Sequence, residues 1–402
     1  MPDRDRTDEI PQVPGAGADP AAPVAPVVGS ASLDAGRAAD AAGAGAAVSA
    51  PALFDGDAVE PGATQAAPSR PRAVVLRRRR RLAAVAALGL AVGLAAGASA
   101  LRHRPAPLVR RDVQAYAGLG AWVDTYDYVT TYAGPNPKVT TATIDGLADR
   151  GVRTIYLQAA RNDTKTPGGI VDADLLASFL ARAHARGIAV IGWSTPRFED
   201  VAFDLDRLVK IATFAHKGQR FDGVAVDIED KDTVPFPVTR TANLVELSKQ
   251  LRAAVGPKAT LGAIVIPPVQ LDIVNPDYWP GFPWGDLRPL YDVWLPMTYW
   301  TTRDASSGWR DGERYTAESI RMLRQHLLDP DARVHAIGGI ADKTTPDDVA
   351  AFLRALAETG AIGGSLYDVA TTSDPVWIAL QPLPQSLAPM PTTTAGPSTT
   401  TG

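Results

Sequence analysis

The sequence predicts an α/β protein whose folded part is a (β/α)8 TIM barrel, preceded by one transmembrane helix and a disordered N-terminal tail. Two observations predict the barrel: short apolar runs alternate with helical stretches, and eight such units fit between residues 118 and 381. Repeated strand–helix units form parallel sheets, and eight units in roughly 260 residues favour closure into a barrel. A third observation, twenty uncharged residues directly behind a run of arginines, predicts the membrane span.

Each expected strand is a short apolar run bounded by polar residues or glycine. The strands are expected at residues 118–123, 154–158, 189–193, 223–229, 260–266, 293–299, 334–340 and 363–367. The helices between them are expected at residues 144–150, 173–186, 205–215, 238–255, 284–291, 317–328 and 346–359. No G-x-G-x-x-G motif follows the first strand, which argues against a dinucleotide-binding sheet.

The chain before the barrel reads as a tail and an anchor. Residues 1–76, rich in Ala, Pro and Gly, are expected to form a disordered cytoplasmic tail. Residues 77–101 hold five arginines and then an uncharged stretch, from Leu82 through to Leu101, long enough to cross the hydrocarbon core of a lipid bilayer. Positive charge on its N-terminal side predicts a single-pass protein of the cell membrane, with its N-terminus in the cytoplasm and its barrel outside.

A linker is expected at residues 102–117, the barrel at 118–381, and a disordered Pro/Thr-rich tail at 382–402. The alternative to an anchor is a secreted protein cleaved near Ala100, because Ala98 and Ala100 have the small-x-small spacing of a signal-peptidase site. In both cases the barrel lies outside the cytoplasm.

Composition excludes several classes of site. The chain has no cysteine, which rules out disulfides, thiolate metal sites and cysteine nucleophiles. Residues 108–385 hold 34 acidic against 28 basic residues, a balance that argues against a nucleic-acid partner. The five histidines lack the spacing of metal ligands, so neither a cofactor nor a metal is expected.

The fourth strand carries the most informative pattern. Side chains alternate along a strand, so Gly223, Ala225, Asp227 and Glu229 are expected to face the barrel interior, with the two carboxylates at the end where barrel active sites lie. Two inward carboxylates so close together favour one of them keeping its proton, which is the condition for a general acid. A structural alternative is that both acids form ion pairs with Arg161 or Arg197.

The segment from Asp222 to Glu229 resembles the D-G-x-D-x-D-x-E strand of the family-eighteen glycoside hydrolases, the chitinases and endo-β-N-acetylglucosaminidases. Met297 and Tyr299 in the sixth strand match the Met-x-Tyr pattern of that family, and Tyr367 stands where the family has an aromatic floor. The resemblance covers nearly the whole barrel, but only the fourth-strand motif is specific.

The resemblance implies that Glu229 protonates the glycosidic oxygen. It implies that Asp227 orients the substrate's own N-acetyl group as the nucleophile, and that Tyr299 hydrogen-bonds this acetamide. The expected substrate is a polysaccharide or glycan that contains N-acetylhexosamine, of the peptidoglycan or chitin type. Ordinary retaining barrel glycosidases place a second carboxylate on strand seven, where this chain has only Asp342 at the very end.

Further residues at strand ends are expected to bind substrate. These are Trp122, Asp124, Gln158, Trp193, Met297, Trp300 and Tyr367, with the loop aromatics Trp279, Trp284 and Trp309 as further candidates. Asp124 and Asp127 also fit a purely structural role as helix caps.

Two departures from the family pattern matter. Ala225 stands where the family has its first inward Asp, and Trp300 replaces the Asp that commonly follows the Tyr of strand six. Both changes favour an alternative, a non-catalytic glycan-binding module like the chitinase-like lectins. A second alternative is a lysozyme-type muramidase, although Trp122 to Asp124 is a poor match to the Gly-Ile-Asp strand with which those enzymes begin.

Overall fold

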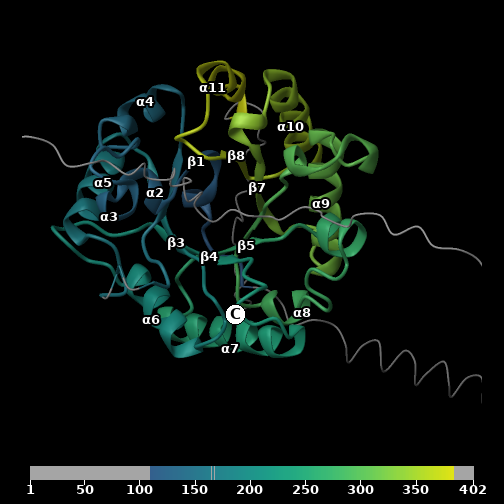
Figure 1. Cartoon of the computed structure of the whole chain (residues 1–402), viewed down its shortest axis with the longest axis horizontal. Helices are drawn as coiled ribbons and strands as arrows, with labels where there is room; N and C mark the ends of the chain where they lie inside the picture. The colour runs from purple at the N-terminus through teal and green to yellow at the C-terminus, as the bar shows by residue number, and fades with distance from the viewer. Residues whose placement is uncertain (1–108, 164, 167, 384–402) are drawn as a thin grey trace, which may run out of the picture. The chain divides into compact units, whose positions relative to one another are not determined.

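A computed structural model describes residues 109–163, 165, 166 and 168–383. Eight parallel strands follow one another in chain order around a closed barrel, with β8 pairing back onto β1, as the sequence predicts (Figure 1). The strands are β1 (Gly118–Val123), β2 (Thr154–Gln158), β3 (Ala189–Ser194), β4 (Gly223–Ile228), β5 (Leu261–Val265), β6 (Val293–Pro296), β7 (Arg333–Ile340) and β8 (Gly363–Tyr367).

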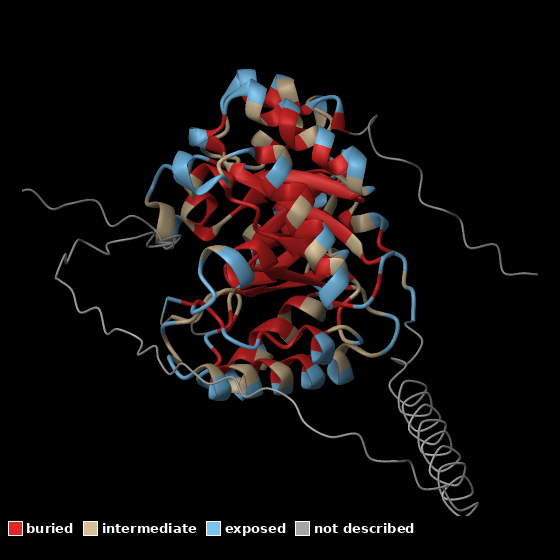
Figure 2. Cartoon of the chain, turned by 90° about the vertical axis from the view of Figure 1, so that its right-hand side faces the viewer, coloured by how far each residue is buried: buried red, intermediate tan, exposed pale blue. Residues whose placement is uncertain are grey.

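Helices surround the barrel and cover the outside of its strands (Figure 1). The α-helices are α2 (Thr125–Tyr128), α3 (Thr130–Ala133), α4 (Thr143–Asp149), α5 (Ala173–Ala185), α6 (Val201–Ala212), α7 (Pro237–Val255), α8 (Trp284–Leu287), α9 (Gly312–His326), α10 (Pro346–Thr359) and α11 (Asp374–Leu380). Shorter turns are η1 (Gln114–Tyr116), the π-helix η2 (Val269–Val274), η3 (Trp300–Thr302), η4 (Ala305–Ser307) and η5 (Ala341–Lys343). Figure 2 shows the buried residues concentrated in the strands and on the inner faces of the helices.

The barrel interior is filled by a few large aromatic side chains set against glycines. Tyr116, just before β1, plugs the N-terminal end of the barrel and donates a hydrogen bond to the carbonyl of Val224 at 2.8 Å. A Cβ at Gly223 would lie 2.6 Å from the Tyr116 hydroxyl, and one at Gly262 would lie 2.9 Å from its ring. These two glycines therefore face inward, and their missing side chains make the room that Tyr116 occupies.

Above this plug, a buried polar network joins β1, β7 and β8. His335 Nδ1 lies 2.8 Å from the carbonyl of Tyr116, which can only accept a hydrogen bond, so Nδ1 carries the proton. His335 Nε2, 3.0 Å from Ser365 Oγ, is then the acceptor, and the same Oγ accepts the Trp122 indole N–H at 2.8 Å. Burial lowers the pKa of His335 to about 4, so the ring is neutral at physiological pH.

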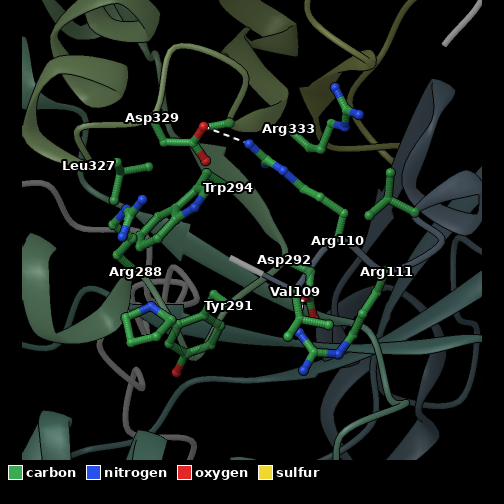
Figure 3. Close-up of a pocket in the computed structure, with 13 residues that line it drawn as sticks. Val109, Arg110, Arg111, Arg288, Tyr291, Asp292, Trp294, Leu327, Asp329 and Arg333 are labelled. Carbon is green, nitrogen blue, oxygen red and sulfur yellow. Dashed lines mark hydrogen bonds and ion pairs between the residues drawn. The ribbon is translucent and has the colours of Figure 1, made fainter. Parts of the chain in front are cut away.

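Residues 109–117, expected to be linker, pack against the N-terminal end of the barrel. Arg110 forms an ion pair with Asp329, and Arg111 forms one with Asp292, both at 2.6 Å. These arginines line a small pocket that also includes Arg288 and Trp294 (Figure 3). The ordering follows from the Tyr116 plug, because a side chain inside the barrel fixes the residues that lead up to it.

The predicted membrane span at residues 82–101 and the tails at 1–76 and 382–402 lie outside the described residues, except that the structure reaches residue 383. Within the part of the chain that the structure describes, no helix is long and apolar enough to cross a bilayer.

Most strand boundaries agree with the prediction to within one residue, and three agree fully. The largest difference is β6, which ends at Pro296, after which Met297 makes only an isolated bridge to Ile337. A proline has no N–H to donate, so the regular hydrogen-bond ladder of β6 ends at Pro296 although the apolar run of the sequence continues beyond it. The short helices α2, α3 and α11 and the π-helix η2 were not predicted, because four to seven residues carry too little periodicity.

We expect Gly363→Ala to destabilise the barrel by roughly 1–3 kcal/mol, since a Cβ there would overlap the His335 ring and lie 2.7 Å from the carbonyl of Gly118. The measurement is urea unfolding followed by circular dichroism. Gly285→Ala is the matched control, because its Cβ would meet nothing within 4 Å. Equal stability of the two variants would contradict this account of how the interior is filled.

Candidate active site

The candidate site is built on the C-terminal end of β4. Ala225 faces the barrel interior, since its Cβ lies 3.3 Å from the position of a Cβ on the inward Gly262. Asp227, two residues further, points to the same side and is only 6% exposed. Glu229 follows directly after the strand and is half-buried. The alternation predicted for this strand therefore holds.

Asp227 is a buried carboxylate with a single hydrogen-bond donor. Thr195 Oγ1, just after β3, donates to Asp227 Oδ2 at 2.8 Å. The other oxygen, Oδ1, is buried and has no hydrogen-bond partner among the residues that the structure describes. Burial raises the pKa of Asp227 to about 7, the Thr195 hydrogen bond works against this rise, and the charge of Asp230 adds to it.

Glu229 lies in an environment that favours its protonated form. Desolvation raises the pKa of Glu229 well above its ordinary range, and the nearby charges of Asp227 and Asp230 raise it further. Within the described part of the chain its carboxyl group has no hydrogen-bond or ion-pair partner. A half-buried acid that keeps its proton and has no partner is suited to donate that proton to a ligand.

The loop that follows Glu229 is held by buried contacts. Tyr278 donates a hydrogen bond from its hydroxyl to the carbonyl of Glu229 at 3.2 Å. Arg240, 2% exposed, donates to the carbonyls of Lys231, Val234 and Tyr278. Asp230 accepts from the backbone N–H and the hydroxyl of Thr233 and so closes the turn, as expected for an acid that caps a loop. The backbone at Glu229 is therefore fixed on both sides.

The ion-pair alternative for the two acids is wrong in this structure. Arg161 pairs with Asp163 at 3.2 Å and lies over the ring of Tyr126. Among the described residues, no ion pair joins Arg197 to Asp227 or Glu229. The two carboxyl groups thus lack the compensating charge that a purely structural role would require.

Tyr299 lies near Asp227 and Glu229, and Tyr367 lies next to Tyr299. Their ring centroids are 6.4 Å apart, and Tyr299 is 7% exposed. Burial raises the pKa of Tyr299, and the charges of Glu229 and Asp227 add to the rise, which places its hydroxyl in their field. Tyr299 is consequently a neutral donor next to the two acids.

Tyr367 is oriented by a residue from the first strand end. Its hydroxyl donates to Asp124 Oδ2 at 2.8 Å. Asp124 also caps α2, because its other carboxylate oxygen accepts the N–H of Tyr126 at 2.7 Å. The helix-cap interpretation of Asp124 is therefore confirmed, and the same side chain fixes an aromatic ring of the candidate site.

Three residues expected to bind substrate are largely buried in the barrel interior. Trp122 stacks on Tyr156 with ring centroids 4.3 Å apart and meets Trp193 edge-on at 5.7 Å. Trp122 is 2% exposed and Trp193 is 5% exposed. Gln158, 4% exposed, accepts hydrogen bonds from the backbone N–H and hydroxyl of Thr125. These three side chains support the floor of the site.

Trp300 is placed differently from the expectation that it binds substrate. It is fully buried between β7 and α10. Its ring centroid lies 5.3 Å from that of Phe352 in α10, and its indole packs against the glycines of β7. A Cβ at Gly338 would lie 2.9 Å from its ring, so the indole fills the space that this glycine leaves. We therefore assign Trp300 to the core.

The remaining aromatic candidates also belong to packing. Trp279 and Trp284 are 1% and 5% exposed. Trp309 is half-buried and lies under the guanidinium group of Arg314. Met297 is 5% exposed on the strand end that leads to Tyr299.

The structure adds residues that the sequence analysis did not identify. Thr195 lies two residues after Trp193, so its side chain faces the same side of the strand. This alternation could have identified Thr195 from the sequence. Asp368, next to Tyr367, joins Asp124 and Asp127 in a group whose ligand atoms lie within 4.8 Å of one another. Burial and these two neighbours raise the pKa of Asp127 to about 8.

This carboxylate group has the spacing of a metal site, but each of the three acids already accepts hydrogen bonds from the protein. Asp124 accepts from Tyr367 and Tyr126, Asp127 accepts the backbone N–H of Asp124, and Asp368 accepts from Thr371. We therefore assign no metal to it.

No protein-family model and no curated protein sequence matches the chain. Comparison with solved structures finds a GH18 chitinase from Cycas revoluta in complex with allosamidin, at 14% identity and TM-score 0.48 over 67% of this chain and 99% of that one. It also finds the spore cortex-lytic enzyme SleL of Bacillus megaterium QM B1551, at 11% identity and TM-score 0.46 over 69% and 75% of the two chains. A third is the PgaB (BpsB) glycoside hydrolase domain from Bordetella bronchiseptica, at 16% identity and TM-score 0.44 over 70% and 97%. At such similarity, the function has to be argued from the residues of this chain.

We expect Asp227→Asn to be more stable than the wild type at pH 8, by ~1–4 kcal/mol in the free energy of unfolding. The pKa of Asp227 is about 7 in the folded protein, whereas an aspartate in the unfolded chain has its ordinary pKa of 3.8, so wild-type stability is lost as the pH rises between these values. The difference should therefore vanish near pH 4. Urea unfolding at both pH values measures it.

Asp232→Asn is the control for this measurement, because the Asp232 side chain is 85% exposed and its neutralisation should leave stability almost unchanged. An Asp227→Asn variant no more stable than the wild type at pH 8 would show that the buried carboxylate is compensated after all.

Proposed function

We propose that the barrel hydrolyses glycosidic bonds in a glycan that contains N-acetylhexosamine, with Glu229 as the general acid. The observation that carries this proposal is the pair on β4, in which Glu229 favours its protonated form while Asp227 is buried beside it with a free oxygen. A proton donor next to a second carboxylate is the arrangement that glycoside hydrolysis needs.

The proposed reaction is retaining and substrate-assisted. Glu229 donates its proton to the glycosidic oxygen as the bond to the anomeric carbon breaks. The acetamide oxygen of the same sugar attacks that carbon, while Asp227 accepts the acetamide N–H and Tyr299 donates a hydrogen bond to the acetamide. Glu229, now ionised, then takes a proton from the water that opens the oxazolinium intermediate, and the site returns to its first state.

A nucleophile from the substrate suits this barrel because a protein nucleophile is lacking where retaining barrels usually have it. In β7 the inward His335 is neutral and tied into the core network, and Asp342 lies beyond the strand in η5. The acetamide requirement limits the substrates to 2-acetamido sugars, as in chitin or peptidoglycan.

We also propose that the barrel acts outside the cytoplasm, tethered to the membrane by residues 82–101. The support is the uncharged length of this stretch and the arginine run before it. Cleavage near Ala100 would instead release the same barrel as a secreted protein.

A Glu229→Gln variant should lose at least about a hundredfold in product release from chito-oligosaccharides or peptidoglycan, because a general acid contributes roughly 10²–10⁴ in rate. Chromatography of products from purified wild type and variant measures this loss. Glu246→Gln, on the exposed side of α7, is the matched control and should keep full activity.

The outcome of this experiment also separates the alternatives. A barrel that binds N-acetylated oligosaccharides but cleaves none, with binding unaffected by Glu229→Gln, is the lectin-like module. Cleavage of peptidoglycan alone, still dependent on Glu229, identifies a muramidase-type activity. Cleavage that persists in Glu229→Gln would overturn the assignment of the acid.

The pH dependence of kcat/KM should show an acidic limb near pH 7. The active form has Glu229 protonated and Asp227 ionised, and the pKa of Asp227 is raised to about 7. The rate should therefore increase with pH through about 7 and fall at higher pH, where Glu229 loses its proton. A profile from pH 4 to 10 measures this, and an optimum at pH 5 would contradict the raised pKa.

A further inference from the structure

The Asp227 carboxyl group has no carboxylate partner below it in the barrel. Ala225 occupies the inward position two residues before it. In the β3–β4 register Trp193 lies beside Ala225, and its indole extends toward Trp122, 5.7 Å between centroids. The space beneath Asp227 is therefore lined by a methyl group and aromatic rings. Within the described part of the chain, Thr195 is the one residue that donates a hydrogen bond to the Asp227 carboxylate.

Thr195 reaches Asp227 through the same register. Ser194 pairs with Val226, so Thr195 and Asp227 follow side by side at the ends of their strands. The distance from Thr195 Oγ1 to Asp227 Oδ2 is 2.8 Å, which is ordinary for a hydroxyl donating to a carboxylate. This bond fixes Oδ2, while the buried Oδ1 has no hydrogen-bond partner among the described residues.

We infer that Thr195 is the positioning residue of the site: its hydroxyl holds Asp227 Oδ2 and so turns Oδ1 toward the substrate's acetamide N–H. This inference rests on the proposed function. The two oxygens of Asp227 have separate tasks, since Oδ2 takes the protein's donor and Oδ1 stays available for the ligand's donor. Thr195 thereby gives Asp227 a polar neighbour, which the methyl group of Ala225 cannot provide.

The hydroxyl also has an electrostatic effect. A hydrogen bond donated to a carboxylate favours its charged form, and here it acts against the desolvation that favours the neutral form. Removing the donor should therefore raise the pKa of Asp227 further. Fewer molecules would then carry the ionised Asp227 at neutral pH.

The test compares Thr195→Val, which keeps the shape and removes the donor, with Thr195→Ser, which keeps the donor. A hydrogen bond to a charged group is worth about 1.5–3 kcal/mol, which corresponds to roughly a 10- to 150-fold change. We expect kcat of Thr195→Val to fall by about this factor, KM to change less than about threefold, and the acidic limb of the pH profile to move to higher pH. Thr195→Ser should stay within about threefold of the wild type.

Thr213→Val, at the exposed C-terminal end of α6, controls for loss of a threonine hydroxyl away from the site. A merely structural role would lower the stability of Thr195→Val and leave the acidic limb in place. That result, or a Thr195→Val enzyme with unchanged kcat, would overturn the inference.

A second readout does not require activity. The Asp227 carboxyl carbon can be followed by NMR during a pH titration, with Asp227→Asn to assign its signal. We expect the Asp227 pKa in Thr195→Val to lie at least about one unit above the wild-type value, since one unit corresponds to about 1.4 kcal/mol. An unchanged pKa overturns the inference.

If the wild type cleaves no glycan while this pKa moves, the proposed hydrolase fails. The positioning of Asp227 by Thr195 then still stands.

Discussion

The packing of the barrel interior is the constraint on which the rest of the structure depends. Eight strands can close around side chains only if large inward residues are opposed by small ones. Here Tyr116 and His335 fit because Gly223, Gly262 and Gly363 leave them room, and the hydrogen bonds of His335 then fix Trp122 through Ser365. The floor of the site is held in place because these buried polar groups are hydrogen-bonded to one another. The carboxylates at the open end stand on this floor.

The fold holds the two carboxyl groups of the site in an electrostatically unfavourable arrangement. Asp227 and Glu229 are desolvated close together without a compensating cation, an arrangement that costs folding free energy. Tyr278 bonds the carbonyl of Glu229 and Arg240 bonds the carbonyl of Lys231 in the following loop, so among the described residues these contacts act on the backbone and leave the Glu229 carboxyl group free. Strain of this kind is common where a group must stay reactive, because full satisfaction of its hydrogen bonds would make it inert.

Much of this architecture could be predicted from the sequence, because alternation along strands is a short-range property. The strand positions and the inward direction of Ala225 and Asp227 follow from it directly. What could not be predicted depends on side-chain volume across the fold. Trp300 fills the space over Gly338 and contacts Phe352, and no local pattern connects these residues. The same holds for Tyr116, which belongs to a stretch that reads as linker.

The attachment of residues 109–116 to the closed end of the barrel has a mechanical consequence. A pull on the chain ahead of Val109 would be resisted first by the ion pairs of Arg110 and Arg111 and then by Tyr116 inside the barrel. The strand ends that carry Glu229 lie at the opposite end of the barrel, so such a pull would reach them only after these contacts, through the hydrogen bonds that join Tyr116 to His335 and Ser365.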